Sequence, residues 1–254
     1  MIAHQSIKNI EENSDDILVI KMDSVPEYDL EDYDLMDEKD RDKYIKDLER
    51  IVRNSFEYRR FIQYLRENMD MDSCAFMENV SNKDNNFSVK IEIHHTPFTL
   101  YDICTTVLNK RLALGLPTNI ELVALEVTAL HYYLFVGLIP LSETVHQLVH
   151  SQYLFVPVTN VLGNYQAFID NYHDYIAPEL LQTYEENLEY SEKLTNNDLS
   201  ILENKPTYVD TSNIYQLPTY EDMIGTMYGR IDEMKQLEDP FKEPKKIIPG
   251  IIYD

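Results

Sequence analysis

Two stretches of the chain decide how it is expected to fold: Ile-Glu-Ile-His-His at residues 91–95 and Leu-Ile-Pro-Leu-Ser-Glu-Thr-Val-His-Gln-Leu-Val-His at residues 138–150. The first stretch closes a run from residue 87 to 93 in which apolar and polar residues alternate. This period of two predicts a strand that ends at the histidine pair. The second stretch predicts a helix that begins after Ser142, because serine is a favoured N-cap residue.

Four of the seven histidines lie in these two stretches. His146 and His150 are four residues apart, so a helix projects both from one face, where two imidazoles can hold one cation. His94 and His95 are neighbours on a strand and point to opposite faces, so they are expected to serve different roles. One further ligand from the strand end would leave coordination positions open for a phosphate oxygen and water, as in a catalytic metal site. A lone His-x-x-x-His pair is common on ordinary helices, so the metal hypothesis depends on both pairs together.

This arrangement resembles the HNH, or ββα-metal, nuclease family. In that family a strand ends in a His-His pair, and a later helix carries His-x-x-x-His after a Leu-x-Pro-Leu stretch, here residues 138–141. The resemblance implies that His94, His146 and His150 bind one divalent ion, which could be Mg, Mn, Ni or Zn. It also implies that His95 is the catalytic general base of a phage-type endonuclease that hydrolyses DNA phosphodiesters.

The sequence departs from the family pattern in three respects. The family's central Asn lies nine residues before the first helix histidine, where this chain has Gly137. There is no Cys-x-x-Cys knuckle, and 50 residues, 96–145, separate the two halves of the motif, so helices must be inserted between them. Nothing in the sequence selects among the residues that could replace the missing Asn, which are His131, Asn160 and Asn164.

The charge of the chain counts against a nucleic-acid partner. The formal net charge is -23, whereas proteins that bind nucleic acid gain most of their affinity from Lys and Arg. Residues 88–173 contribute only six acidic and three basic side chains, so the acidic excess lies in the flanking segments. Two alternatives to the nuclease therefore stay open: a catalytically degenerate HNH fold that serves as a virion structural or protein-interaction component, and an acidic regulator that binds a basic protein.

The expected fold class is α+β, with a ββα-metal core enlarged by inserted helices. Four segments are predicted: an acidic, partly extended segment at 1–37, a helical segment at 38–78, the HNH-like core at 79–180, and a helix with an extended C-terminal arm at 181–254. The acidic tract and the C-terminal arm are candidate surfaces for protein partners. Hydrophobic periodicity predicts helices at 38–68 (one or two), 100–114, 119–135, 142–150, 165–175, 181–194 and 219–237, and strands at 17–20, 87–93 and 153–158.

The two cysteines, Cys74 and Cys104, fit neither a disulfide framework nor a zinc knuckle, so both are expected to be buried free thiols in a reducing compartment. The apolar runs are shorter than the roughly 20 residues that cross a bilayer. We therefore expect an intracellular protein without a membrane partner, in the host cytoplasm if the protein is viral, or in the virion.

Overall fold

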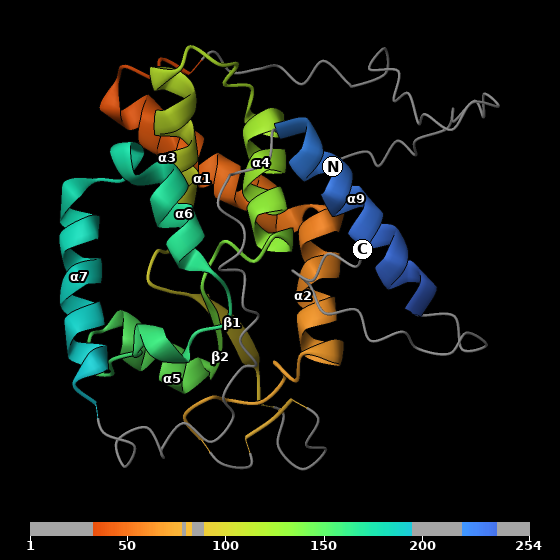
Figure 1. The fold of residues 1–254 in the computed structure, drawn as a ribbon, viewed down its shortest axis with the longest axis vertical. Coiled ribbons are helices and arrows are strands. Elements are labelled where there is room, and N and C mark those ends of the chain that lie inside the picture. The colour runs from red at the N-terminus through yellow and green to blue at the C-terminus, as the bar shows by residue number, and fades with distance from the viewer. Residues whose placement is uncertain (1–32, 78–79, 83–88, 195–219, 238–254) are drawn as a thin grey trace. The chain divides into compact units, whose positions relative to one another are not determined.

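The computed structural model describes residues 33–77, 80–82, 89–194 and 220–237, and its order of elements is drawn in Figure 1. By their contacts, residues 1–41 and 42–254 form two separate units. The predicted strand at 17–20 and most of the predicted C-terminal arm lie outside the described residues. The described elements are α1 (Glu38–Asn54), α2 (Phe56–Asn68), β1 (Ile91–His95), α3 (Leu100–Ala113), α4 (Ile120–Tyr132), β2 (Leu138–Ser142), α5 (Glu143–His150), α6 (Tyr165–Tyr172), α7 (Pro178–Glu192) and α9 (Tyr220–Leu237).

The predicted helical segment at 38–68 consists of two helices, α1 and α2. Ser55 separates them, because its backbone is extended and its hydroxyl accepts a hydrogen bond from the N–H of Tyr58, which caps α2. The apolar face of α1 is buried at Tyr44, Ile45, Leu48 and Val52. Amphipathic periodicity therefore predicted this helical segment correctly, and the structure shows that it consists of two helices and not one.

The only sheet among the described residues pairs β1 with β2 in antiparallel fashion. In its register His94 faces Ile139 and His95 faces Leu138, so both histidines belong to the strand and do not follow it. The sequence did not predict β2, since Pro140 lacks the N–H that a central strand needs. In this two-stranded sheet Pro140 is tolerated, and its carbonyl accepts a hydrogen bond from Ala75 at 2.9 Å.

A buried ion pair joins α3 to α4. Arg111 Nε donates to Glu126 Oε2 at 2.6 Å, and both side chains are less than 10 % exposed. The hydroxyl of Tyr172, on α6, donates to the other oxygen of Glu126 at 2.9 Å. Removing one partner of such a buried pair is strongly destabilising, because it leaves an uncompensated charge in the core. Three helices are therefore held in register by one polar network.

Two predicted elements differ from the structure. Helix α4 ends at Tyr132 and not at 135, because Leu134 adopts a positive φ of 54° that a helix cannot continue through. The predicted strand at 153–158 is wrong: the segment leads into a 3₁₀ turn at Val158–Asn160, and Val158 donates its N–H to Ser191 on α7. The remaining helix predictions agree with α3, α5, α6, α7 and α9, although α7 begins at Pro178.

The α+β class is confirmed, as a mostly helical fold with one small sheet, whereas the ββα-metal identity of its core is not confirmed. Cys74 and Cys104 are both buried, and neither forms a disulfide within the described residues, as predicted. No helix among the described residues is both long and apolar enough to cross a bilayer.

Gly137 lies where the chain passes close to the residue that follows β1. Its carbonyl accepts a hydrogen bond from the N–H of Thr96 at 3.0 Å. A Cβ atom at this position would lie 1.9 Å from the carbonyl oxygen of Thr96 and 2.9 Å from Cγ1 of Val161. The position therefore excludes every side chain, and the Asn of the HNH pattern cannot be accommodated there.

We predict that Gly137→Ala lowers the free energy of unfolding by about 3 kcal/mol, because the added methyl group must displace backbone. The matched control is Gly225→Ala, at an exposed position of α9 where nothing lies within 4 Å of the added atom. That change should raise stability by roughly 0.5–1 kcal/mol. Urea denaturation of both variants checks the prediction, and equal stability of the two would contradict it.

Candidate metal centre

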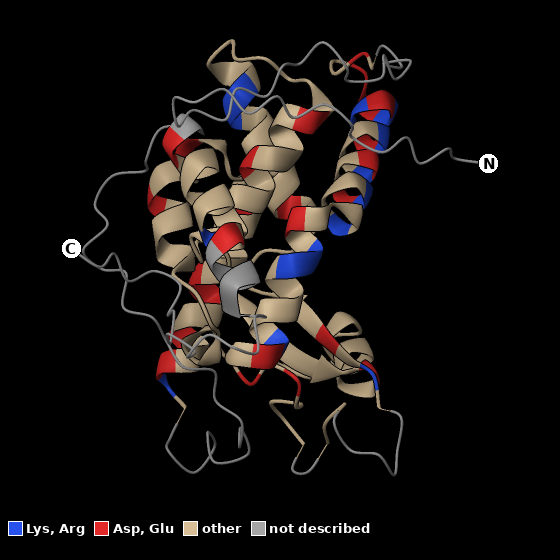
Figure 2. Ribbon diagram, turned by 90° about the vertical axis from the view of Figure 1, so that its right-hand side faces the viewer, with Lys and Arg blue, Asp and Glu red and all other residues tan. Residues whose placement is uncertain are grey.

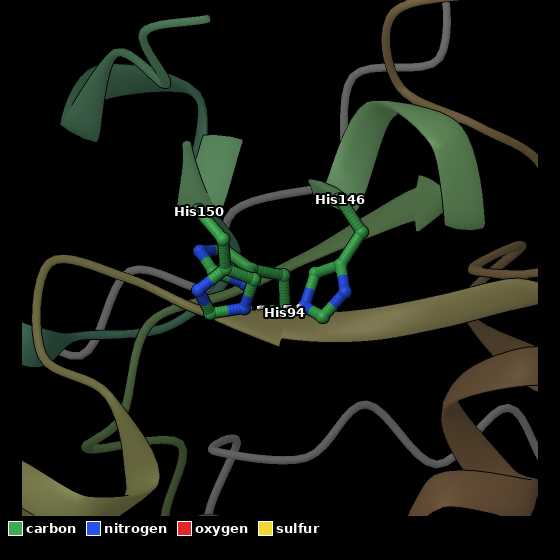
Figure 3. Close-up of side chains that lie close together, drawn as sticks. All are labelled: His94, His146 and His150. Atoms are coloured by element: carbon green, nitrogen blue, oxygen red, sulfur yellow. Dashed lines mark hydrogen bonds between the residues drawn. The ribbon is translucent and has the colours of Figure 1, made fainter. Parts of the chain in front are cut away.

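Three of the four predicted histidines converge in the structure. His94 projects from β1, and His146 and His150 project from one face of α5, as Figure 3 shows. Helix α5 is placed by two features: Ser142 caps it by accepting a hydrogen bond from Val145, and the Val145 side chain enters the core that includes Ile91 and Ile139. The antiparallel sheet and this short helix together bring residues about 50 positions apart into one group.

The distances suit a single bound cation. One ring nitrogen from each histidine lies within 4.8 Å of the others, and the Nε2 atoms of His146 and His150 are 3.1 Å apart. The ring centroid of His94 lies 4.9 Å from that of His146 and 5.2 Å from that of His150. Tetrahedral ligands at about 2.0–2.1 Å from a zinc ion are roughly 3.3 Å from one another. Small movements of the side chains would therefore complete a three-histidine site.

Glu92 fixes the orientation of His146. Its Oε2 atom lies 2.7 Å from His146 Nδ1, so Nδ1 donates to the carboxylate and Nε2 is left free as the ligand atom. The ammonium group of Lys90 and the nearby His146 lower the pKa of Glu92, which keeps it ionised. At metal sites, a histidine that binds the metal with one ring nitrogen commonly donates the N–H of its other ring nitrogen to a carboxylate. Sequence reasoning missed Glu92, although its position two residues before His94 on a strand places both on one face.

Burial lowers the pKa of two of these imidazoles, those of His94 and His146, and so favours their neutral form. Desolvation, and then the proximity of His146 and His150, lower the pKa of His94 to about 4. Desolvation is also the main reason that the pKa of His146 is lowered. The neutral imidazole is the form that binds metal, so His94 and His146 are in the form that binds a cation at neutral pH.

His95 does not join the other three. Its Nε2 lies 2.9 Å from Nε2 of His131, on α4, and both side chains are buried. His131 Nδ1 lies 2.7 Å from the carbonyl oxygen of Val127, which can only accept, so Nδ1 carries the proton and Nε2 accepts from His95. His131 is therefore a hydrogen-bonded core residue, and the predicted role of His95 as a general base stays a prediction. Asn164 caps α6 by accepting from Ala167, and Asn160 is buried.

The three-histidine group opens into a pocket of about 290 Å³. Besides the three histidines and Glu92, two arginines from different helices line it: Arg53 of α1 and Arg66 of α2. Figure 2 shows Lys and Arg alternating with Asp and Glu along one helix, at the upper right, whereas the other helices are mostly uncharged. Arg53 has Glu49 as a neighbour, with 3.4 Å between Nη2 and Oε1. The pocket thus combines a candidate cation site with two fixed positive charges.

The comparisons with known proteins identify a family of virion proteins. A family model described as bacteriophage G278-like virion protein matches residues 1–215, most of the chain. No curated protein and no solved structure matches. The resemblance to HNH nucleases is therefore wrong: the matching family is one of virion proteins, and no nuclease family was found. Two His pairs and a Leu-x-Pro-Leu stretch were not enough to identify the family, because such short motifs specify few contacts of the fold.

The buried pair His95 and His131 predicts a loss of stability in acid. Burial lowers the pKa of His131 from 6.5 to about 4, so the unfolded chain takes up a proton at a pH where the folded chain does not. The free energy of unfolding is therefore retained above about pH 6.5 and falls between there and pH 4, by roughly 1.4 kcal/mol per pH unit for each proton.

The test is urea denaturation at pH 7, 6 and 5 in the presence of EDTA. We expect His131→Gln to show a shallower dependence on pH than the unaltered chain, although it is less stable at pH 7. His173→Gln, at an exposed histidine, should keep the original dependence. The same slope in the chain with and without His131 would show that His131 is not held neutral by burial.

Proposed function

The chain belongs to the bacteriophage G278-like virion protein family, and we propose that it is a structural component of the virion that binds one divalent metal ion through His94, His146 and His150. The observation that carries the metal site is the pair of Nε2 atoms 3.1 Å apart on α5, with a third imidazole from β1 beside them. Glu92 supports it, because its hydrogen bond leaves the ligand atom of His146 free.

The ligand set favours particular ions. Imidazole nitrogens suit zinc, nickel and copper, whereas magnesium and calcium prefer oxygen ligands. We therefore narrow the expected metal to zinc or nickel, with zinc the better match to a three-histidine site that keeps a fourth position.

The metal would stabilise a part of the fold that buries little apolar surface. Helix α5 has eight residues, of which only Val145 is buried, and isolated helices of this length are marginal in water. A cation that joins His94 on β1 to two residues of α5 would hold the helix on the sheet. This role is structural and needs no catalytic step.

A structural component of a virion is expected to contact other virion proteins. Large aromatic side chains are exposed on the segment that follows α5 and on α7. Tyr153 is 82 % and Tyr190 54 % accessible, and Tyr190, on α7, packs edge to face on Phe155. Exposed aromatic residues of this kind are enriched at protein interfaces. They support a role in contacts with neighbouring proteins, beside the acidic tract and the C-terminal arm.

We predict that the purified chain, incubated with Zn²⁺ and then desalted, retains one equivalent of zinc. Because the ion binds only the folded form, at one hundred times its dissociation constant it should stabilise the chain by about 2.7 kcal/mol. Elemental analysis and thermal unfolding measure the two effects. His94→Ala and His150→Ala should abolish both, while His173→Ala should abolish neither. A chain that stays metal-free in excess Zn²⁺ would overturn the proposal.

A second prediction concerns Glu92. Glu92→Gln should weaken zinc binding by about tenfold or more, since the amide no longer offers a charged acceptor to His146 Nδ1. Glu143→Gln removes the same charge from an exposed position in the first turn of α5 and serves as the matched control. Competition with a chromophoric chelator measures the zinc affinity of both variants. Equal affinities would show that the hydrogen bond from His146 to Glu92 does not support zinc binding.

A further inference from the structure

We propose that the open coordination position of this metal ion takes a carboxylate from an Asp or Glu side chain of a neighbouring protein in the virion, and that Arg53 and Arg66 bind the same carboxylate. This inference rests on the proposed metal site and adds the chemical class of its ligand. The metal would then join this chain to a neighbouring protein, and it would also hold α5 on the sheet within this chain.

The first observation is that the protein ligands are incomplete. Three histidines supply three nitrogens, and zinc in structural sites takes four ligands. Among the described residues that line the pocket, Glu92 has the only carboxylate. Both of its oxygens are engaged, one with His146 and one with Lys90. The described part of the chain therefore offers no fourth ligand, and the fourth position would face the pocket that all three histidines line.

The second observation is the charge of the pocket wall. Within the described residues, the ion pair of Arg53 is a long contact with Glu49, at 3.4 Å, and half of the Arg53 side chain is exposed. Arg66 donates through Nη2 to the carbonyl oxygen of Ile91, while its buried Nε has no hydrogen-bond partner within the described residues. With a divalent ion bound, two guanidinium groups and one carboxylate leave the pocket strongly positive. An anion is the ligand that these groups recognise.

The chemistry of the whole chain favours a single carboxylate over a polyanion. A net charge of -23 repels a nucleic acid or another polyphosphate at long range. A carboxylate on a protein surface carries one charge and can be surrounded by basic groups that complement this acidic chain. It can also bind the metal with one oxygen and a guanidinium with the other. Membership of a virion protein family supports other proteins as the partners of this chain.

The test uses the full chain loaded with Co²⁺, whose visible absorption reports its ligands. Sodium acetate is titrated against sodium phosphate, at constant ionic strength with perchlorate. We expect acetate to change the spectrum in a saturable way and to bind more tightly than phosphate. Arg53→Met should weaken acetate about fivefold to tenfold, and Arg53→Lys should restore part of the loss. Arg59→Met, which removes an exposed arginine outside the pocket, should leave acetate binding unchanged.

The outcomes separate this inference from the metal site. If Co²⁺ binds but acetate leaves the spectrum unchanged, the metal site stands and the carboxylate proposal is overturned. Tighter binding of phosphate than of acetate overturns it as well, and assigns the pocket to phosphate groups. If Arg53→Met and Arg59→Met bind acetate equally, Arg53 has no part in the site. Failure of Co²⁺ to bind at all overturns the metal site and this proposal together.

Discussion

The pairing of β1 with β2 is the interaction on which the rest of the described structure depends. It joins two segments that more than 40 residues separate, and it sets the register in which His94 faces Ile139. The hydrogen bond from Thr96 to Gly137 continues this close contact beyond the strands. Because α5 follows β2 without a loop, the same pairing places His146 and His150 of α5 next to His94 of β1.

Two adjacent residues of β1 contact different helices, because neighbouring side chains on a strand point to opposite faces. His94 and His95 differ by one position, yet one lies with the histidines of α5 and the other bonds to a histidine of α4. The first group is partly open to a pocket that two arginines line. The second group is buried, with His95 at the pocket wall and both ring nitrogens of His131 in hydrogen bonds. A group of imidazoles at a pocket can exchange ligands, whereas a buried neutral pair supports the packing of the helices around it.

The family assignment changes what these histidines imply. As part of a nuclease they would serve hydrolysis, and the absent Asn would be a defect. In a phage virion protein the same residues suit a structural ion, and Gly137 is required by the backbone of Thr96. The strongly acidic composition, which disagreed with a DNA substrate, agrees with a protein whose partners are other proteins. The virion alternative weighed from the sequence is thus the one that the family supports.

Local patterns in the sequence determined much of the fold by themselves. Amphipathic periodicity, Ser142 as a cap and the spacing of His146 and His150 depend on residues within a few positions of one another, so they could be read directly. Only the tertiary structure decided the rest: β2 exists because β1 pairs with it, Gly137 is fixed by a distant carbonyl, and Glu92, Arg53 and Arg66 meet the histidines from separate elements. These features are contacts between segments far apart in the chain, and no local pattern encodes which of them will touch.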